Sequence, residues 1–254
     1  MTAFFDFYHQ IGPALSLLVI VTFVLAGAVK GVIGLGLPTI AMGLLGLAMH
    51  PAQAAALLIV PSTLTNLWQL AAGGHLLALL RRLGAMLLMI FAGTLLGSAW
   101  LGIDSGPWAA HALGAALVAY ALYGLAGPGL RTPLARERWL GPLCGLATGV
   151  VTAATGVFVI PAVPYLQSLG LTRDEMVQAL GMSFTVSTVA LAIGLAGQDA
   201  LGGAELGASL LMLAPALLGM IGGQWLRQRI SPALFKRCFF IGLAMLGGHL
   251  LFNG

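Results

Sequence analysis

The sequence predicts an all-α integral membrane protein, a polytopic helical bundle of two inverted repeats with broken or re-entrant helices and about 8–10 membrane segments. Its composition is too apolar for a soluble domain, because 7% of the residues are charged and the mean hydropathy is +1.02. Soluble domains have roughly 25% charged residues. The apolar runs have the length of membrane helices and lack the alternation of barrel strands. Glycine and proline interrupt two of these runs at matching places in the chain.

Ten apolar segments follow one another along the chain. The first five lie near 12–30, 37–49, 52–73, 84–102 and 108–127. The second five lie near 139–155, 157–169, 174–197, 205–226 and 231–252. A basic hinge at 131–138 separates the two sets, so we expect a first repeat at 1–130 and a second at 131–254. A shift of 122 residues brings Gly27 onto Gly149 and Gly34 onto Gly156, which supports a duplication.

The basic residues predict how the two halves are oriented. Ten of the eleven lie near 81–82, 131–138, 173–175 and 227–237, whereas the opposite loops near 50, 104 and 199–205 have none. Cytoplasmic loops are enriched in Lys and Arg, so these four places are expected in the cytoplasm. The repeats are then inverted, with both termini outside. Each loop and terminus stays on the same side of the membrane if the first two segments of each half form a re-entrant hairpin instead of crossing. Both arrangements therefore remain open. Because the basic residues are spread over short loops, no nucleic-acid partner is expected.

The first interrupted helix runs from Phe23 to Met49 and dissolves between Gly31 and Pro38. Irregular backbone in a bilayer must be buried in protein or line a cavity, so this break is a candidate binding site. The helix that resumes there offers unpaired N–H groups and a positive dipole end to an anion. The candidate residues of this break are Gly34, Gly36, Pro38 and Thr39.

The second break, at 152–161, has fewer glycines but adds two hydroxyl groups that can donate to an oxyanion. Its candidate residues are Thr152, Thr155 and Gly156. The alternative is that the glycines only permit close helix packing. We favour packing for Gly27 and Gly149, and a binding role for the glycines of the two breaks.

Lys30 is the one basic residue outside the four basic places. An ionisable residue in a membrane segment indicates function by default, and here a lysine could receive an anionic substrate. The alternative, with equal weight, is that Lys30 lies near the cytoplasmic end of its helix and extends its ammonium to water.

A polar stripe marks the third segment of each half. Ser62, Asn66 and Gln69 share one helical face, and Ser183 and Ser187 share a face of the equivalent segment. Hydroxyl groups commonly bond between helices, but a buried Asn–Gln pair is costly without partners. We therefore favour Asn66 and Gln69 over Ser183 and Ser187 as substrate-binding residues.

The sequence predicts neither an enzyme nor a bound cofactor or metal. Cys144 and Cys238 are isolated, and the five histidines lack the spacing of metal ligands. The chain has no recognisable nucleophile–base pair, paired acids or nucleotide-binding GxGxxG loop.

Four stretches together resemble the TauE/SafE sulfite exporter family: GAVKGVIGLGLPTIAM, GVVTAATGVFVIPAVPYL, AAALLIVPSTLTNLWQ and QALGMSFTVSTVAL. The resemblance spans nearly the whole chain. It implies a multi-pass protein of the bacterial inner membrane that moves sulfite, sulfonates or related small sulfur-containing anions. The second break departs from the family pattern, with Phe158 where a small residue is expected.

The sequence thus favours a secondary transporter of a small anion, working by alternating access around the two breaks. The alternatives are a membrane scaffold or accessory subunit and a channel-like pore. The expected partners are the anion and the lipid bilayer, and a homo-oligomer is compatible with the sequence. The transporter hypothesis predicts a polar pocket between residues 31–39, residues 152–161 and the polar stripe.

Overall fold

The computed structural model describes residues 3–71, 74–101, 108–127 and 129–253, and within them every regular element is a helix. The helices of the first half are α1 (Ala3–Ile33), α2 (Leu37–Leu45), α3 (Pro51–Ala71), α4 (Leu76–Trp100) and α5 (Trp108–Ala126). Those of the second half are α6 (Leu134–Thr155), α7 (Ala162–Ser168), α8 (Arg173–Ala196), α9 (Gly203–Leu211), α10 (Leu213–Arg227) and α11 (Pro232–Asn253). The all-α prediction is confirmed for the described residues.

Seven spans in the described part of the chain are long and apolar enough to cross a membrane, with α9 and α10 counted as one. The other expected segments correspond to α6, whose first turns contain three charged residues, and to the short helices α2 and α7. The predicted ranges 37–49 and 157–169 were too long as helices, because α2 ends at Leu45 and residues 157–161 are irregular.

Two more boundaries were predicted wrongly. Arg81 and Arg82, expected in a loop, lie inside α4, which begins at Leu76 rather than 84. Lys236 and Arg237 lie inside α11 in the same way. Arginine and lysine are good helix formers whose long side chains reach water from a helix end. A charge therefore marks the end of an apolar run without ending the helix.

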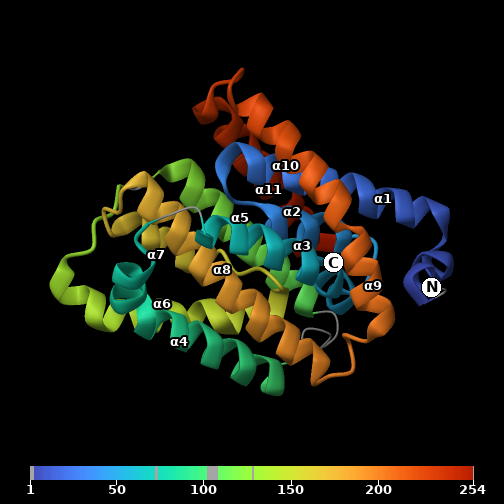
Figure 1. The fold of residues 1–254 in the computed structure, drawn as a ribbon, viewed down its shortest axis with the longest axis horizontal. Coiled ribbons are helices and arrows are strands. Elements are labelled where there is room, and N and C mark those ends of the chain that lie inside the picture. The colour runs from blue at the N-terminus through green and yellow to red at the C-terminus, as the bar shows by residue number, and fades with distance from the viewer. Residues whose placement is uncertain (1–2, 72–73, 102–107, 128, 254) are drawn as a thin grey trace.

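Helices from the two halves pair with each other across the bundle. α4 packs along α6 and α1 along α10, while α3 and α8 lie between these two pairs (Figure 1). Glycine allows the helices of both outer pairs to approach closely. A Cβ added to Gly149 would lie only 2.5 Å from the Ile90 carbonyl oxygen, and a Cβ added to Gly27 would overlap the carbonyl oxygen of Ala216. The packing role expected for Gly27 and Gly149 agrees with these contacts.

The contacts also give the relative directions of the paired helices. In α1 and α10, Val24 lies against Gly219 and Ala28 against Gly223, so these helices are parallel. α4 and α6 are parallel for the same reason, because Met86 lies against Gly145 and Thr94 against Gly149.

The two central helices run in opposite directions. Asn66 of α3 bonds to Thr188 of α8, whereas Leu70, one turn further along α3, bonds to the earlier residue Gln178. α3 and α8 are therefore antiparallel, and their shared interface contains most of the buried polar side chains discussed below.

Candidate functional site

The Lys30 side chain lies in the last turn of α1 and is only 5% exposed. Its Nζ donates to Thr65 Oγ1 at 2.9 Å and to Asn66 Oδ1 at 2.5 Å, both on α3. Among the described residues it has no carboxylate partner. An ammonium group has three N–H donors, so the third remains available. Lys30 is thus buried against protein, and the alternative of an ammonium extended into water does not describe it.

Pro61 shapes the part of α3 that receives Lys30. Proline has no N–H, so the carbonyl of Leu57 loses its usual partner within the helix. Ser209 of α9 compensates, since its Oγ donates to that carbonyl at 2.8 Å and accepts from the Val60 N–H at 3.0 Å. Thr65 Oγ1 in turn donates to the Pro61 carbonyl at 2.7 Å, which leaves the hydroxyl oxygen to accept from Lys30.

Asn66 joins three helices. Its Oδ1 accepts from Lys30 of α1, and its Nδ2 donates to Thr188 Oγ1 of α8 at 3.3 Å. Because an ammonium can only donate, the amide oxygen must face Lys30. Three hydroxyls of α3 and α8, those of Ser62, Ser183 and Ser187, are buried and have no hydrogen-bond partner among the described residues.

Gln69 holds the first break one turn further along α3. Its Nε2 donates to the Gly34 carbonyl at 2.9 Å, while its Oε1 is buried without a partner. Gly34 and Gly36 have φ angles of 77° and 108°, a region that glycine occupies without a Cβ penalty. The break therefore turns back sharply after Lys30 and presents its backbone to Gln69.

Two adjoining cavities of about 460 and 420 Å³ open beside this break. They share Gly34, Gln69, Arg173, Val177 and Arg227. Lys30 lines the first cavity and Lys236 the second. No Asp or Glu occurs among the residues described as lining either one. The charged residues described as lining the two cavities are therefore all basic, and Lys30 is the buried one among them.

Comparison with known families decides the identity of the fold. Residues 19–250 match the model of the family described as "Sulfite exporter TauE/SafE". The chain belongs to the TauE/SafE family. Comparison with curated proteins gives no match, and neither does comparison with solved structures. TauE/SafE proteins are membrane exporters of sulfite and related sulfur compounds, so the seven apolar spans belong to a multi-pass membrane protein of a transporter family.

In this TauE/SafE chain, the predicted candidates of the first half fall into two groups. Lys30, Gly34 and Gln69 line the first cavity, and Asn66 lies behind Lys30. The other three, Gly36, Pro38 and Thr39, are buried at the start of α2 and line neither cavity. Thr39 Oγ1 bonds to the Gly36 carbonyl at 3.0 Å, so it closes the turn.

The candidates of the second half do not join this pocket. Thr152 and Thr155 donate their hydroxyls to carbonyls of α6 at 2.7 Å. Gly156, with a φ of 68°, lies against the Met42 side chain, and Phe158 packs on Phe184 with ring centroids 5.2 Å apart. The described pocket is thus bounded by the first break and the polar stripe, and residues 152–161 lie outside it.

Arg173 and Arg227 were missed as candidate site residues. Arg173 is the first residue of α8 and lies between Thr172 and Glu175, which form the capping box of this helix. Arg227 is the last residue of α10. Both were explained by membrane orientation alone, and their distance in sequence hides that they line one cavity. Their basic charge was a usable signal, because a cluster of Arg residues near the membrane can bind an anion as well as orient the chain.

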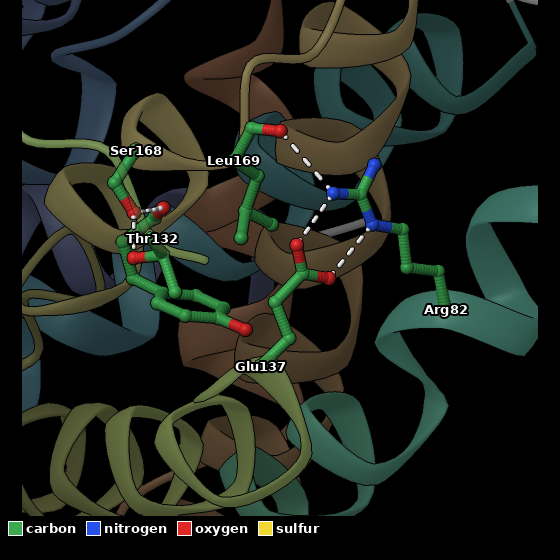
Figure 2. Close-up of polar contacts among 6 residues, drawn as sticks. Arg82, Thr132, Glu137, Ser168 and Leu169 are labelled. Atoms are coloured by element: carbon green, nitrogen blue, oxygen red, sulfur yellow. Dashed lines mark hydrogen bonds and ion pairs between the residues drawn. The ribbon is translucent and has the colours of Figure 1, made fainter. Parts of the chain in front are cut away.

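A second polar cluster connects the segment before α6, called the linker below, to the bundle (Figure 2). Arg82 of α4 pairs with Glu137 of α6 through bonds of 2.7 and 2.9 Å and donates to the Leu169 carbonyl at 3.2 Å. Thr132 of the linker bonds to Ser168 at the end of α7 through both hydroxyls, 2.6 Å apart, and through its backbone N–H. Residue 169 is followed closely by Arg173, so the linker cluster and the basic cavity lie at the same end of the bundle.

Proposed function

We propose that this chain is a secondary transporter that moves sulfite, a sulfonate or a related small sulfur-containing anion by alternating access. The observation that supports this most directly is the Lys30 ammonium, which is buried at the wall of an open cavity and has no carboxylate partner in the described part of the chain. Burying a charge is costly unless it is paired. Thr65 and Asn66 satisfy two of its donors but supply no negative charge. An anion is the missing partner.

The chemistry of the cavity mouth suits a sulfur oxyanion. Arg173 and Arg227 present guanidinium groups, whose planar fork of donors matches two oxygens of one anion. Positive charge of one sign around a cleft also raises the local concentration of anions. The substrate would enter between the arginines and reach Lys30 beside the backbone of Gly34.

We further propose that residues 1–130 and 131–254 are inverted repeats. The antiparallel packing of α3 on α8 supports this, as does the bond between Asn66 and Thr188, which are separated by 122 residues. Equivalent residues of two repeats meet only on the axis that relates them. Inverted repeats with the site at their interface are typical of secondary transporters. The basic end would face the bacterial cytoplasm, with both termini on the other side.

The scaffold hypothesis predicts that the Asn66–Gln69 face packs against protein without a cavity. Asn66 itself is packed, but Gln69 and Gly34 border open space. This favours transport over a purely structural role.

The test is uptake and efflux of sulfite, methanesulfonate and short carboxylates in proteoliposomes. Lys30→Met and Asn66→Ala are compared with Arg131→Met, which changes an exposed basic residue that lines neither cavity. A hydrogen bond to a charged group contributes about 1.5–3 kcal/mol, so Lys30→Met should weaken anion binding roughly 10- to 150-fold. Arg131→Met should transport normally. If the unaltered protein moves none of these anions above empty liposomes, the proposal fails.

A further inference from the structure

The α4–α6 pair repeats the close helix packing of the α10–α1 pair, whose residues line the basic cavity. Gly219 lies against the Val24 carbonyl, and Gly93 lies against the carbonyl of Leu146, which is 122 residues beyond Val24. Gly223 and Gly97 repeat the relation one turn later, against Ala28 and Val150. The α4–α6 pair is thus built like the α10–α1 pair.

This correspondence gives six residues of the basic cavity a counterpart at the other end of the bundle. Lys30, Gly34 and Gln69 correspond to Thr152, Gly156 and Leu191, and Trp68 corresponds to Ala190. On the paired helix, Met220 and Gln224 correspond to Thr94 and Ser98.

The two sets differ sharply in exposure. Trp68 is 70% exposed, whereas Ala190 is fully buried, and Gln224 is exposed whereas Ser98 is only 8% exposed. Thr94 and Thr152 are completely buried. Three contacts close this end. The Ala153 methyl lies against Gly97, Met42 lies against Gly156, and Gln198 Nε2 donates to the Ser98 carbonyl at 2.6 Å.

We propose that Thr94, Ser98, Thr152 and Gly156 line a second anion passage, closed in this structure, through which the substrate leaves at the end opposite the basic cavity. This inference rests on the proposed transport function. The passage differs from the basic cavity in chemistry, since none of its four residues is charged. Thr94 and Thr152 hydroxyls bond to carbonyls of their own helices at 2.8 and 2.7 Å. They can rotate to donate to a passing oxyanion, as neutral groups that bind it more weakly than Lys30 does.

The test is labelling of introduced cysteines by a membrane-impermeant maleimide, in a background in which Cys144 and Cys238 are replaced by Ser. Gln224→Cys reports access from the basic end and so defines the sidedness of sealed vesicles. Ser98→Cys and Thr94→Cys report access from the other end, and either suffices if one fails to fold. Methanesulfonate serves as the anion because it does not react with maleimide.

We expect Ser98→Cys and Thr94→Cys to be labelled only in vesicles of the orientation opposite to that in which Gln224→Cys reacts. Methanesulfonate on the basic side should accelerate this labelling about fivefold or more, a usual size for ligand-driven coupling. Absence of labelling in both orientations, or labelling from the basic side, overturns the passage. Methanesulfonate flux is measured on the same vesicles. Flux without labelling from the opposite side rejects this passage alone, and labelling without flux of any tested anion rejects the proposed function alone.

Discussion

Asn66 contacts the Lys30 ammonium through a neutral amide group. Its amide oxygen and nitrogen are both occupied, one by Lys30 and one by Thr188, so the side chain positions the ammonium without neutralising it. A carboxylate at the same place would form an ion pair with Lys30 and act as an internal substitute for the anion. In the proposed function, the neutral amide leaves the charge of Lys30 for the anion to balance.

The substitution Asn66→Asp tests this at the scale of one atom. We expect it to raise the apparent KM for anion transport more than Asn66→Ala does, because the new carboxylate competes with the substrate for Lys30. Thermal unfolding in detergent should show Asn66→Asp no less stable than Asn66→Ala, since the buried ammonium gains a partner. Equal KM values for the two variants would mean that Lys30 does not receive the anion.

At the scale of elements, α3 depends on a neighbour for its own backbone bonds. Pro61 lies inside the membrane-competent helix α3, one turn before Thr65 and Asn66, which hold Lys30. Ser209 of α9 donates to the Leu57 carbonyl that the missing N–H of Pro61 leaves, and its Oγ also accepts from the Val60 N–H. The position of Thr65 and Asn66 is thus coupled to α9, which belongs to the other half of the chain.

Ser209→Ala removes the bond to the Leu57 carbonyl, whose partner within the helix Pro61 has already eliminated, and the bond from the Val60 N–H. A buried polar group left unsatisfied costs about 1–3 kcal/mol, so the variant should unfold at a lower temperature in detergent micelles. Pro61→Ala restores an N–H that can bond to Leu57 within α3. The double variant Pro61→Ala/Ser209→Ala should therefore lose less stability than Ser209→Ala alone. If the stability losses of the two single variants simply add in the double variant, Ser209 does not replace the backbone bond that Pro61 removes.

Much of this architecture is predictable from sequence, because hydrophobic length and glycine–proline breaks act locally. The first break and the Asn66–Gln69 stripe are located correctly as buried or cavity-lining structure. The burial of Lys30 is not predictable, since it depends on Thr65 and Asn66 meeting it from another helix. The exclusion of residues 152–161 from the pocket depends on the packing of Met42 and Phe184, which no local pattern encodes.

At the scale of the molecule, the basic end differs from the rest of the surface in the sign of its charge. Arg173, Arg227 and Lys236 come from three helices and converge on the two cavities, while Glu137 is paired with Arg82 outside them. In the proposed orientation, the basic residues that would face the cytoplasm also create a field that attracts anions. The proposal thus gives one set of residues a part in both membrane topology and anion capture.

Neutralising the cavity mouth separates these two roles. We expect Arg173→Gln/Arg227→Gln to slow the initial rate of anion entry from the basic side and to make that rate less dependent on ionic strength. The reason is that steering by exposed charges is screened over about 10 Å at 0.1 M salt. Arg131→Gln/Arg138→Gln removes the same charge from residues near the linker that line neither cavity and should leave the salt dependence unchanged. Initial fluxes of methanesulfonate in oriented vesicles between low and high salt measure the difference. Identical salt dependence in the two double variants would show that net charge, rather than the cavity, attracts the anion.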